Sequence, residues 1–134
     1  NNFNNSDFTF LLHNLIKSNN NISTTEFTID VDEIIDWSTY SSLIKINVYR
    51  ILQELFLNVN KYANAKKCAL KMTVEKADLC VSVTDDGIGF EVSKISDGIG
   101  LKNIKERVEI VKGTLTVLSK IDKGAQFNIS IPIE

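Results

Sequence analysis

The most informative stretch of this chain is Asp85-Asp86-Gly87-Ile88-Gly89-Phe90. It follows residues 79–84, where apolar and polar side chains alternate as they do in a half-buried β-strand. Side chains two positions apart share one face of a strand, so Asp85 ends the core-facing row. A carboxylate there is costly unless a donor meets it, and the two glycines let the backbone approach a ligand closely. The stretch predicts a buried acceptor at the mouth of a pocket, although an ordinary Asp/Gly turn gives the same pattern.

Composition limits the class of protein. The chain has 134 residues, enough for one domain with a buried core. With 43% apolar residues, 24% charged residues and a net charge of −2, it is typical of a soluble globular domain, not of a nucleic-acid-binding or membrane-surface protein. Cys68 and Cys80 lack metal-type spacing and are predicted to be reduced packing residues in a cytosolic domain. Because the chain begins without Met, we expect it to be a fragment of a longer protein, itself cytoplasmic or anchored to a membrane.

Helical periodicity is clearest from about residue 42 to residue 63. Apolar residues recur there three or four positions apart and form one stripe. A polar row runs beside the stripe and contains Asn47, Arg50, Glu54, Asn58 and Lys61. The simplest interpretation of this row is the solvated edge of the helix. However, an amide oxygen together with phosphate oxygens suits Mg²⁺, and a carboxylate one turn away can act as a base.

Two further helices are predicted. One covers about residues 8–18, with Asp7 as its cap, and residues 17–25 are expected to form a polar loop rich in asparagine. His13 in this helix is interpreted as structural or solvated. The other helix opens at Gly98-Ile99-Gly100 after a short polar loop at 91–97, and it runs to about Lys112 with Gly113 as its C′ residue. Free N–H groups at such a helix start favour phosphate.

Alternating patterns predict five strands. Two of them form a hairpin around residues 76–78, and the last two are joined by a turn at 122–124. Pro132 indicates a strand end or an edge strand. One sheet of about five strands, polar on one face and covered by about three helices on the other, is a two-layer α+β sandwich. The predicted strands are 27–31, 67–76, 79–85, 114–119 and 125–133, with a connector at 32–42 that holds a short helical turn.

From about Phe27 to Ile133 the chain resembles the ATP-binding domain of bacterial sensor histidine kinases, within the gyrase, Hsp90, histidine-kinase and MutL ATPase superfamily. The Arg-x-x-Gln-Glu start, the short lid and the Lys-Glu-Arg-Val run resemble the subclass of nitrate-responsive and membrane-fluidity sensors. The resemblance implies the Bergerat fold, with one mixed sheet in a domain at 23–134, after a linker or the tail of a dimerisation helix at 1–22. Residues 50–63 resemble the N box, 85–90 the G1 box, 98–108 the G2 box and 124–132 the closing strand.

The resemblance also implies roles for individual residues. Asp85 would accept a hydrogen bond from the adenine amine of ATP, and Asn58 would coordinate Mg²⁺ between the phosphates. Glu54 would stand at the position of the catalytic base. Lys61 would lie near the phosphates and Tyr62 beside the nucleotide. The other residues expected to shape the pocket and hinge the lid are Gly87, Gly89, Gly98, Ile99, Gly100 and Leu101.

The function implied is autophosphorylation. The family transfers the γ-phosphate of ATP to a histidine on a separate dimerisation domain, and then to an aspartate on a response-regulator receiver domain. His13 is followed by Asn14, unlike the phosphoacceptor motif, so we expect that domain upstream in a homodimeric parent. Neither nucleic acid nor direct membrane contact is expected for this domain.

Three departures and two alternatives accompany this hypothesis. Tyr62 stands where the subclass usually has His, Ala125 where Thr is frequent, and Asn103 where Gly is common. None of these removes a residue that the mechanism requires. An anti-sigma-factor-type serine kinase shares the same boxes, and a non-catalytic nucleotide-binding regulatory module is the other alternative. Retention of the acidic, amide and glycine residues argues against the latter.

Overall fold

A five-stranded sheet organises the fold, in a computed structural model that describes residues 5–92 and 101–133. β1 pairs with β2 in parallel, and every other neighbouring pair is antiparallel. The mixed sheet of about five strands that we predicted is therefore confirmed. The strands lie in the order β1 (Glu26–Val31), β2 (Lys67–Glu75), β3 (Asp78–Asp85), β5 (Ala125–Pro132) and β4 (Thr114–Ser119).

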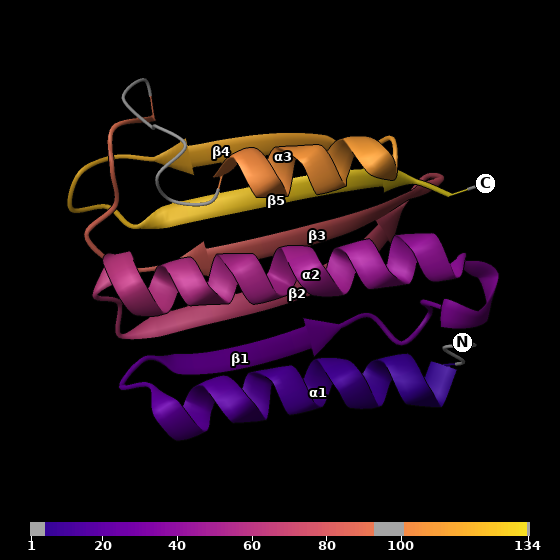
Figure 1. Cartoon of the computed structure of the whole chain (residues 1–134), viewed down its shortest axis with the longest axis horizontal. Helices are drawn as coiled ribbons and strands as arrows, with labels where there is room; N and C mark the ends of the chain where they lie inside the picture. The colour runs from indigo at the N-terminus through magenta and orange to yellow at the C-terminus, as the bar shows by residue number, and fades with distance from the viewer. Residues whose placement is uncertain (1–4, 93–100, 134) are drawn as a thin grey trace.

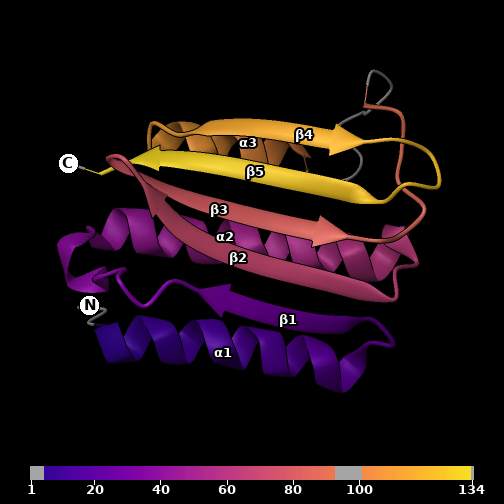
Figure 2. The same cartoon turned by 180° about the vertical axis from the view of Figure 1, so that it is seen from behind.

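Three helices in the described residues cover one face of this sheet: α1 (Asn5–Ile22), α2 (Ser42–Asn58) and α3 (Leu101–Ile110) (Figure 1). The view from behind shows the opposite face of the strands without a helix over it (Figure 2). Side chains on β2 and β3 alternate accordingly, since Leu70, Met72, Leu79 and Val81 are buried under the helices. The predicted two-layer sandwich is confirmed.

The first helix is longer than predicted. It runs from Asn5 to Ile22, so Asp7 lies in its first turn and not at its cap. Residues 17–22, which we expected in a loop, are helical. Asn20 explains the extension, because its side-chain amide both donates a hydrogen bond to β1 and accepts one from it. Asn20 Nδ2 donates to the Phe27 carbonyl at 3.0 Å, and the Phe27 N–H donates to Asn20 Oδ1 at 2.7 Å. These bonds fasten the end of an asparagine-rich helix to the sheet.

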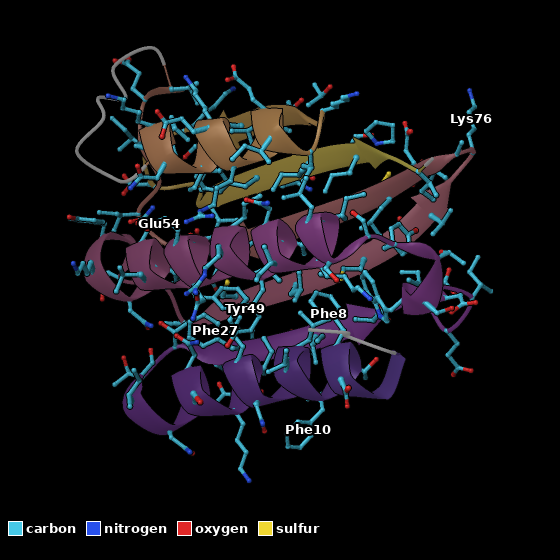
Figure 3. All side chains as sticks on the ribbon, turned by 45° about the vertical axis from the view of Figure 1, so that its right-hand side comes forward. Phe8, Phe10, Phe27, Tyr49, Glu54 and Lys76 are labelled. Carbon is cyan, nitrogen blue, oxygen red and sulfur yellow. The ribbon has the colours of Figure 1, made fainter. Side chains whose placement is uncertain are left out.

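Only one side of α1 belongs to the core. Phe8 points inward, and its ring lies 4.6 Å from that of Trp37 in the short helical turn η1 (Trp37–Thr39), which we had predicted (Figure 3). Phe10 points away and is 65% exposed, and His13 is exposed as expected. The assignment of residues 1–22 to a linker or to the tail of a dimerisation helix stays a prediction, because this packing is compatible with either.

The long central helix changes its geometry at its end. α2 begins after Ser41, whose Oγ accepts a hydrogen bond from the Ile44 N–H at 3.1 Å. A π-helical turn, η2 (Val59–Ala63), follows Asn58 directly. The predicted extent of 42–63 is therefore confirmed, but the last turn is wider than an α-helical one. Such turns occur frequently at functional sites.

The end of α3 corrects one assignment. We expected a helix to about Lys112 with Gly113 at C′, but the helix ends at Ile110 and Lys112 takes the left-handed conformation, with φ 59°. The Lys112 N–H donates to the Glu109 carbonyl at 2.9 Å and the Gly113 N–H to the Val108 carbonyl at 2.8 Å, which is a Schellman motif. Gly113 is needed for space, because a Cβ there would lie 2.9 Å from the Ser130 carbonyl oxygen.

Several smaller predictions concern the sheet. Pro132 marks the end of the interior strand β5, not an edge strand. Cys68 and Cys80 are free thiols, and burial, with the nearby Asp85 and Asp86 charges, raises the pKa of Cys68 to about 12. In the part of the chain that the structure describes, no helix combines the length and apolarity needed to cross a bilayer.

Candidate functional site

A cavity of about 570 Å³ lies where β3 ends, between the last turns of α2 and the β4–β5 turn. Its volume is that of a pocket for a small organic ligand. Strand residues line one part of the cavity, helical residues another, and loop residues complete the rim. The lining consists of Asp85, Ala125 and Phe127 from the strands, Leu55, Asn58, Val59, Tyr62 and Ala63 from α2 and η2, and Ile88, Gly89, Phe90, Glu91 and Ile121 from the loops.

Asp85 is the buried carboxylate of this cavity. It ends β3 on the helix-covered face and is only 7% exposed. Burial raises the pKa of Asp85, and the neighbouring Asp86 charge raises it further, while the N–H groups of Gly87 and Ala125 partly offset both. The Gly87 N–H donates to Asp85 Oδ1 at 2.8 Å. A carboxylate offers about four acceptor positions, so capacity remains for a ligand donor.

The loop after Asp85 is pinned against the end of α2. The Ile88 N–H donates to the Ala63 carbonyl at 2.8 Å. A Cβ on Gly87 would collide with the same carbonyl oxygen, far inside van der Waals contact. Gly87 thus permits a close backbone approach without lining the cavity itself. Gly89 does line it, and with φ 62° it takes a conformation that favours glycine.

The β4–β5 turn is locked onto the same loop. The Asp122 N–H donates to the Ile88 carbonyl at 2.6 Å. The Phe90 N–H donates to Ser119 Oγ at 2.9 Å, and this hydroxyl donates to the Gly124 carbonyl at 2.7 Å. Gly124 has φ 75° and packs against the backbone of Asp85. Three segments that are distant in sequence therefore form one interlocked rim.

The predicted site residues divide between this cavity and its surroundings. Asn58, Tyr62, Asp85 and Gly89 line the cavity. Glu54 lies one helical turn before Asn58 and borders a separate groove of about 420 Å³ between α2 and α3, on the side of α2 that faces α3 (Figure 3). Lys61 is exposed and is not part of the cavity lining in the described residues.

Only part of the predicted phosphate-binding helix start lies within the described residues. Leu101 is the first residue of α3 and is buried in the core instead of lining the cavity. Gly98, Ile99 and Gly100 lie outside the described residues, as does most of the predicted loop at 91–97. Their proposed contacts with phosphate stay predictions.

Sequence reasoning missed the apolar part of the lining. Val59 belonged to the apolar stripe of α2, and Ile88 stood inside the Asp/Gly stretch, but neither was assigned to the site. Ile121 carried a signal of its own, because it is the apolar residue of the otherwise polar turn at 120–124.

A partly buried polar contact joins α3 to α2. Asn47 is 3% exposed, and its Oδ1 accepts a hydrogen bond from Arg107 Nη1 at 3.2 Å. Its Nδ2 donates to the Leu43 carbonyl at 2.9 Å. The polar row of α2 is therefore not simply a solvated edge, since this member of it is buried and joined to another helix.

Asn47→Ala is expected to lower the free energy of unfolding by about 1–2 kcal/mol, because it leaves the partly buried Arg107 guanidinium without this acceptor. Urea denaturation followed by circular dichroism measures the change. Gln53→Ala is the matched control, since Gln53 accepts a bond of the same length, 3.2 Å, from Arg50 on the same helix, and this bond is exposed. A loss of stability no larger for Asn47→Ala than for Gln53→Ala would contradict the structural role of the pair.

The donor atoms of the cavity suit a metal ion that is also coordinated by phosphate oxygens better than one coordinated by protein alone. No group of three or more His, Cys, Asp or Glu side chains within residues 5–92 and 101–133 is placed to hold a metal. Asn58 brings an amide oxygen to the cavity wall. Mg²⁺ commonly takes one or two protein ligands and completes its shell with phosphate oxygens and water.

Comparison with known families identifies a match over most of the chain. Residues 44–134 match the family described as histidine kinase-, DNA gyrase B-, and HSP90-like ATPase. The signal transduction histidine-protein kinase/phosphatase DegS of Brevibacillus brevis is 32% identical over 110 residues, which are 81% of this chain and 28% of DegS. The sensor histidine kinase LiaS of Bacillus subtilis (strain 168) is 29% identical over 106 residues, 78% of this chain and 29% of LiaS. The chain thus spans less than a third of either relative.

Solved structures share the fold. The Erythrobacter litoralis EL346 blue-light activated histidine kinase superposes with a TM-score of 0.77 at 19% identity, over 91% of this chain and 40% of that protein. The Acinetobacter baumannii histidine kinase AdeS gives a TM-score of 0.76 at 16% identity, over 95% of this chain and 65% of the AdeS chain. These similarities confirm the predicted fold class.

Proposed function

Because the chain belongs to the histidine kinase-, DNA gyrase B-, and HSP90-like ATPase family, we propose that it is the ATP-binding catalytic domain of a sensor histidine kinase. The observation that carries the proposal is that Asp85 and Asn58, from two different elements, line one cavity of about 570 Å³. Both relatives described above are histidine kinases by name. The nitrate-sensor and membrane-fluidity-sensor subclass is proposed on the Arg50 to Glu54 lead-in, the short lid and the Lys105 to Val108 run.

In this proposal the adenine base enters the cavity with its amine toward Asp85, which accepts the hydrogen bond as a carboxylate. The apolar side chains of Val59, Ile88 and Phe127 exclude water from the faces of the base. Asn58 would hold Mg²⁺, which neutralises charge on the phosphates when bound. Glu54, one turn before Asn58, would take the proton of the attacking group as the γ-phosphoryl group is transferred.

The acceptor and partners follow from the same proposal. A histidine on a dimerisation domain of the parent protein receives the phosphoryl group, and the receiver domain of a response regulator receives it next. The parent acts as a homodimer, with this domain in the cytoplasm. Acid treatment of the labelled parent tests the acceptor, because phosphohistidine is acid-labile whereas phosphoserine is acid-stable. Acid-stable label would favour the serine-kinase alternative.

ATP with Mg²⁺ is expected to raise the thermal unfolding temperature of this chain. At a concentration of 100 times Kd the gain is about 2.7 kcal/mol, which corresponds to roughly 5–10 °C for a domain of this size. Addition of EDTA should reduce the gain, because the phosphates then lack their counter-ion. GTP is the matched control, since the guanine oxygen would face the Asp85 carboxylate in place of an amine. Absence of any shift with ATP, or an equal shift with GTP, would contradict the proposal.

A further inference from the structure

Building on the proposed nucleotide site, we propose that Ile121 is a nucleotide-contacting residue and that the β4–β5 turn which carries it is a preformed wall of the base-binding end of the cavity. Ile121 lines the cavity from the turn between β4 and β5. The helical wall comes instead from α2 and η2, a different part of the chain, and includes Val59 and Tyr62. The base would therefore lie between a helix and this turn.

The exposure of the side chains around the rim favours a ligand there. Ile121 is 65% exposed, although it borders a cavity. Ile88 and Tyr62 border the same cavity and are each 50% exposed. Three large apolar or aromatic side chains from three separate segments thus leave their surface open around one hollow. A ligand with an apolar face that fills the hollow would remove this surface from water, which is favourable.

The turn is held in place without a ligand. The Asp122 N–H, next to Ile121 in sequence, donates to the Ile88 carbonyl at 2.6 Å. The carbonyl of Lys120, on the other side of Ile121, packs so closely on Gly89 that no Cβ fits there. Both neighbours of Ile121 are therefore fixed to the loop that follows Asp85. A wall that is already ordered adds contact with little loss of conformational entropy on binding.

The same contacts assign Ile121 to the base end of the cavity. Gly124, in the same turn, packs against the backbone of Asp85, which in the proposed function binds the adenine amine. Asn58, which would hold the metal ion, belongs to α2 instead. Ile121 is consequently expected to contact the base or the ribose, and its contribution should not depend on the number of phosphates.

The test is isothermal titration of ATP and of AMP into the wild-type chain and into Ile121→Ser. Removal of the apolar contact is expected to weaken both ligands by the same factor, about tenfold. Ile121→Val, which keeps most of the apolar surface, should restore most of the affinity. Leu118→Ser is the matched control, since Leu118 is on the same hairpin and 54% exposed but does not border this cavity. The affinity of Leu118→Ser for ATP and for AMP should equal that of the wild type.

The outcomes separate this inference from the proposed function. Wild-type binding together with unchanged affinity in Ile121→Ser would overturn the role of Ile121 and leave the nucleotide site standing. Equal losses in Ile121→Ser and Leu118→Ser would also overturn it, because the effect would then belong to the hairpin as a whole. Failure of the wild type to bind ATP would overturn the proposed function and this inference with it.

Discussion

Asp85→Asn is expected to lower the affinity for ATP by about 100-fold or more. In the proposed function, the substitution removes a charge-assisted hydrogen bond to the adenine amine and leaves a buried donor without a full partner, which together cost about 3 kcal/mol. The shape of the cavity is retained, since the asparagine side chain is nearly the same size as that of Asp85 and its oxygen can accept from the Gly87 N–H. Isothermal titration of both proteins with ATP and Mg²⁺ measures the difference.

The same substitution is expected to leave the ligand-free chain at least as stable as the wild type. Burial raises the pKa of Asp85 above the ordinary value of 3.8, so the folded chain binds more protons than the unfolded chain between that value and the raised pKa. Stability therefore falls as pH rises through this interval, and the ionised carboxylate costs stability at neutral pH. Asp85→Asn removes that cost. Weak binding by a stable, folded variant is the combination that assigns Asp85 to the ligand.

Asp86→Asn is the matched control for this experiment. Asp86 is exposed, and its Oδ1 accepts from the N–H groups of Lys66 at 2.8 Å and Lys67 at 3.0 Å. These bonds lower the pKa of Asp86 and hold the loop, but the side chain is not part of the cavity lining in the described residues. ATP affinity should change little in this variant. Unchanged affinity in Asp85→Asn, or an equal loss in Asp86→Asn, would contradict the assignment of Asp85.

Gly87→Ala is expected to lower the free energy of unfolding by about 3 kcal/mol. Its new Cβ would collide with the Ala63 carbonyl oxygen, the same oxygen that accepts the Ile88 N–H at 2.8 Å. The loop must then move away from the end of α2 and lose this bond. Because the loop also bonds to Asp85, ATP affinity should fall with stability. Urea denaturation and titration calorimetry measure the two effects.

Gly113→Ala provides a graded comparison. Neither Gly87 nor Gly113 is at positive φ, so both substitutions report close approach and not backbone strain. At Gly113 the nearest atom to the new Cβ is the Ser130 carbonyl oxygen at 2.9 Å, so the backbone must still shift, but by less than the overlap at Gly87 requires. We expect a loss of about 1 kcal/mol there, with ATP affinity retained. Equal and small losses in both variants would show that the Gly87 contact is not essential.

The fold was predictable because periodicity reports burial directly. The stripe on α2 and the alternation on β2 and β3 follow from which faces touch the core, so their positions could be read with small errors at the ends. The end of α1 could not, because its asparagines are held helical by bonds between Asn20 and the distant Phe27. The left-handed residue after α3 was misplaced by one, because Gly113 is required by contact with Ser130 and not by its own conformation.

The residues of the candidate cavity could be predicted only where the chemistry of the side chain itself suggested ligand binding. Asp85 at the end of a core-facing row and Asn58 on a helix face both reached the cavity. Glu54 borders a neighbouring groove instead, because it lies on the side of α2 that faces α3, whereas the adjacent Leu55 lines the cavity. The apolar rim, including Ile121, depends on how the β4–β5 turn docks on the loop after β3. No local pattern in the sequence specifies that docking.

The parallel pairing of β1 with β2 has a consequence for the boundaries of this domain. The match to the ATPase family begins at residue 44, after β1, yet β1 covers the outer edge of β2 along six residue pairs from Glu26 to Val31. A chain cut at the start of that similarity would leave a row of unpaired amides and carbonyls on β2, open to strands of other molecules. The sheet of this domain therefore begins well before the residue at which the family match begins.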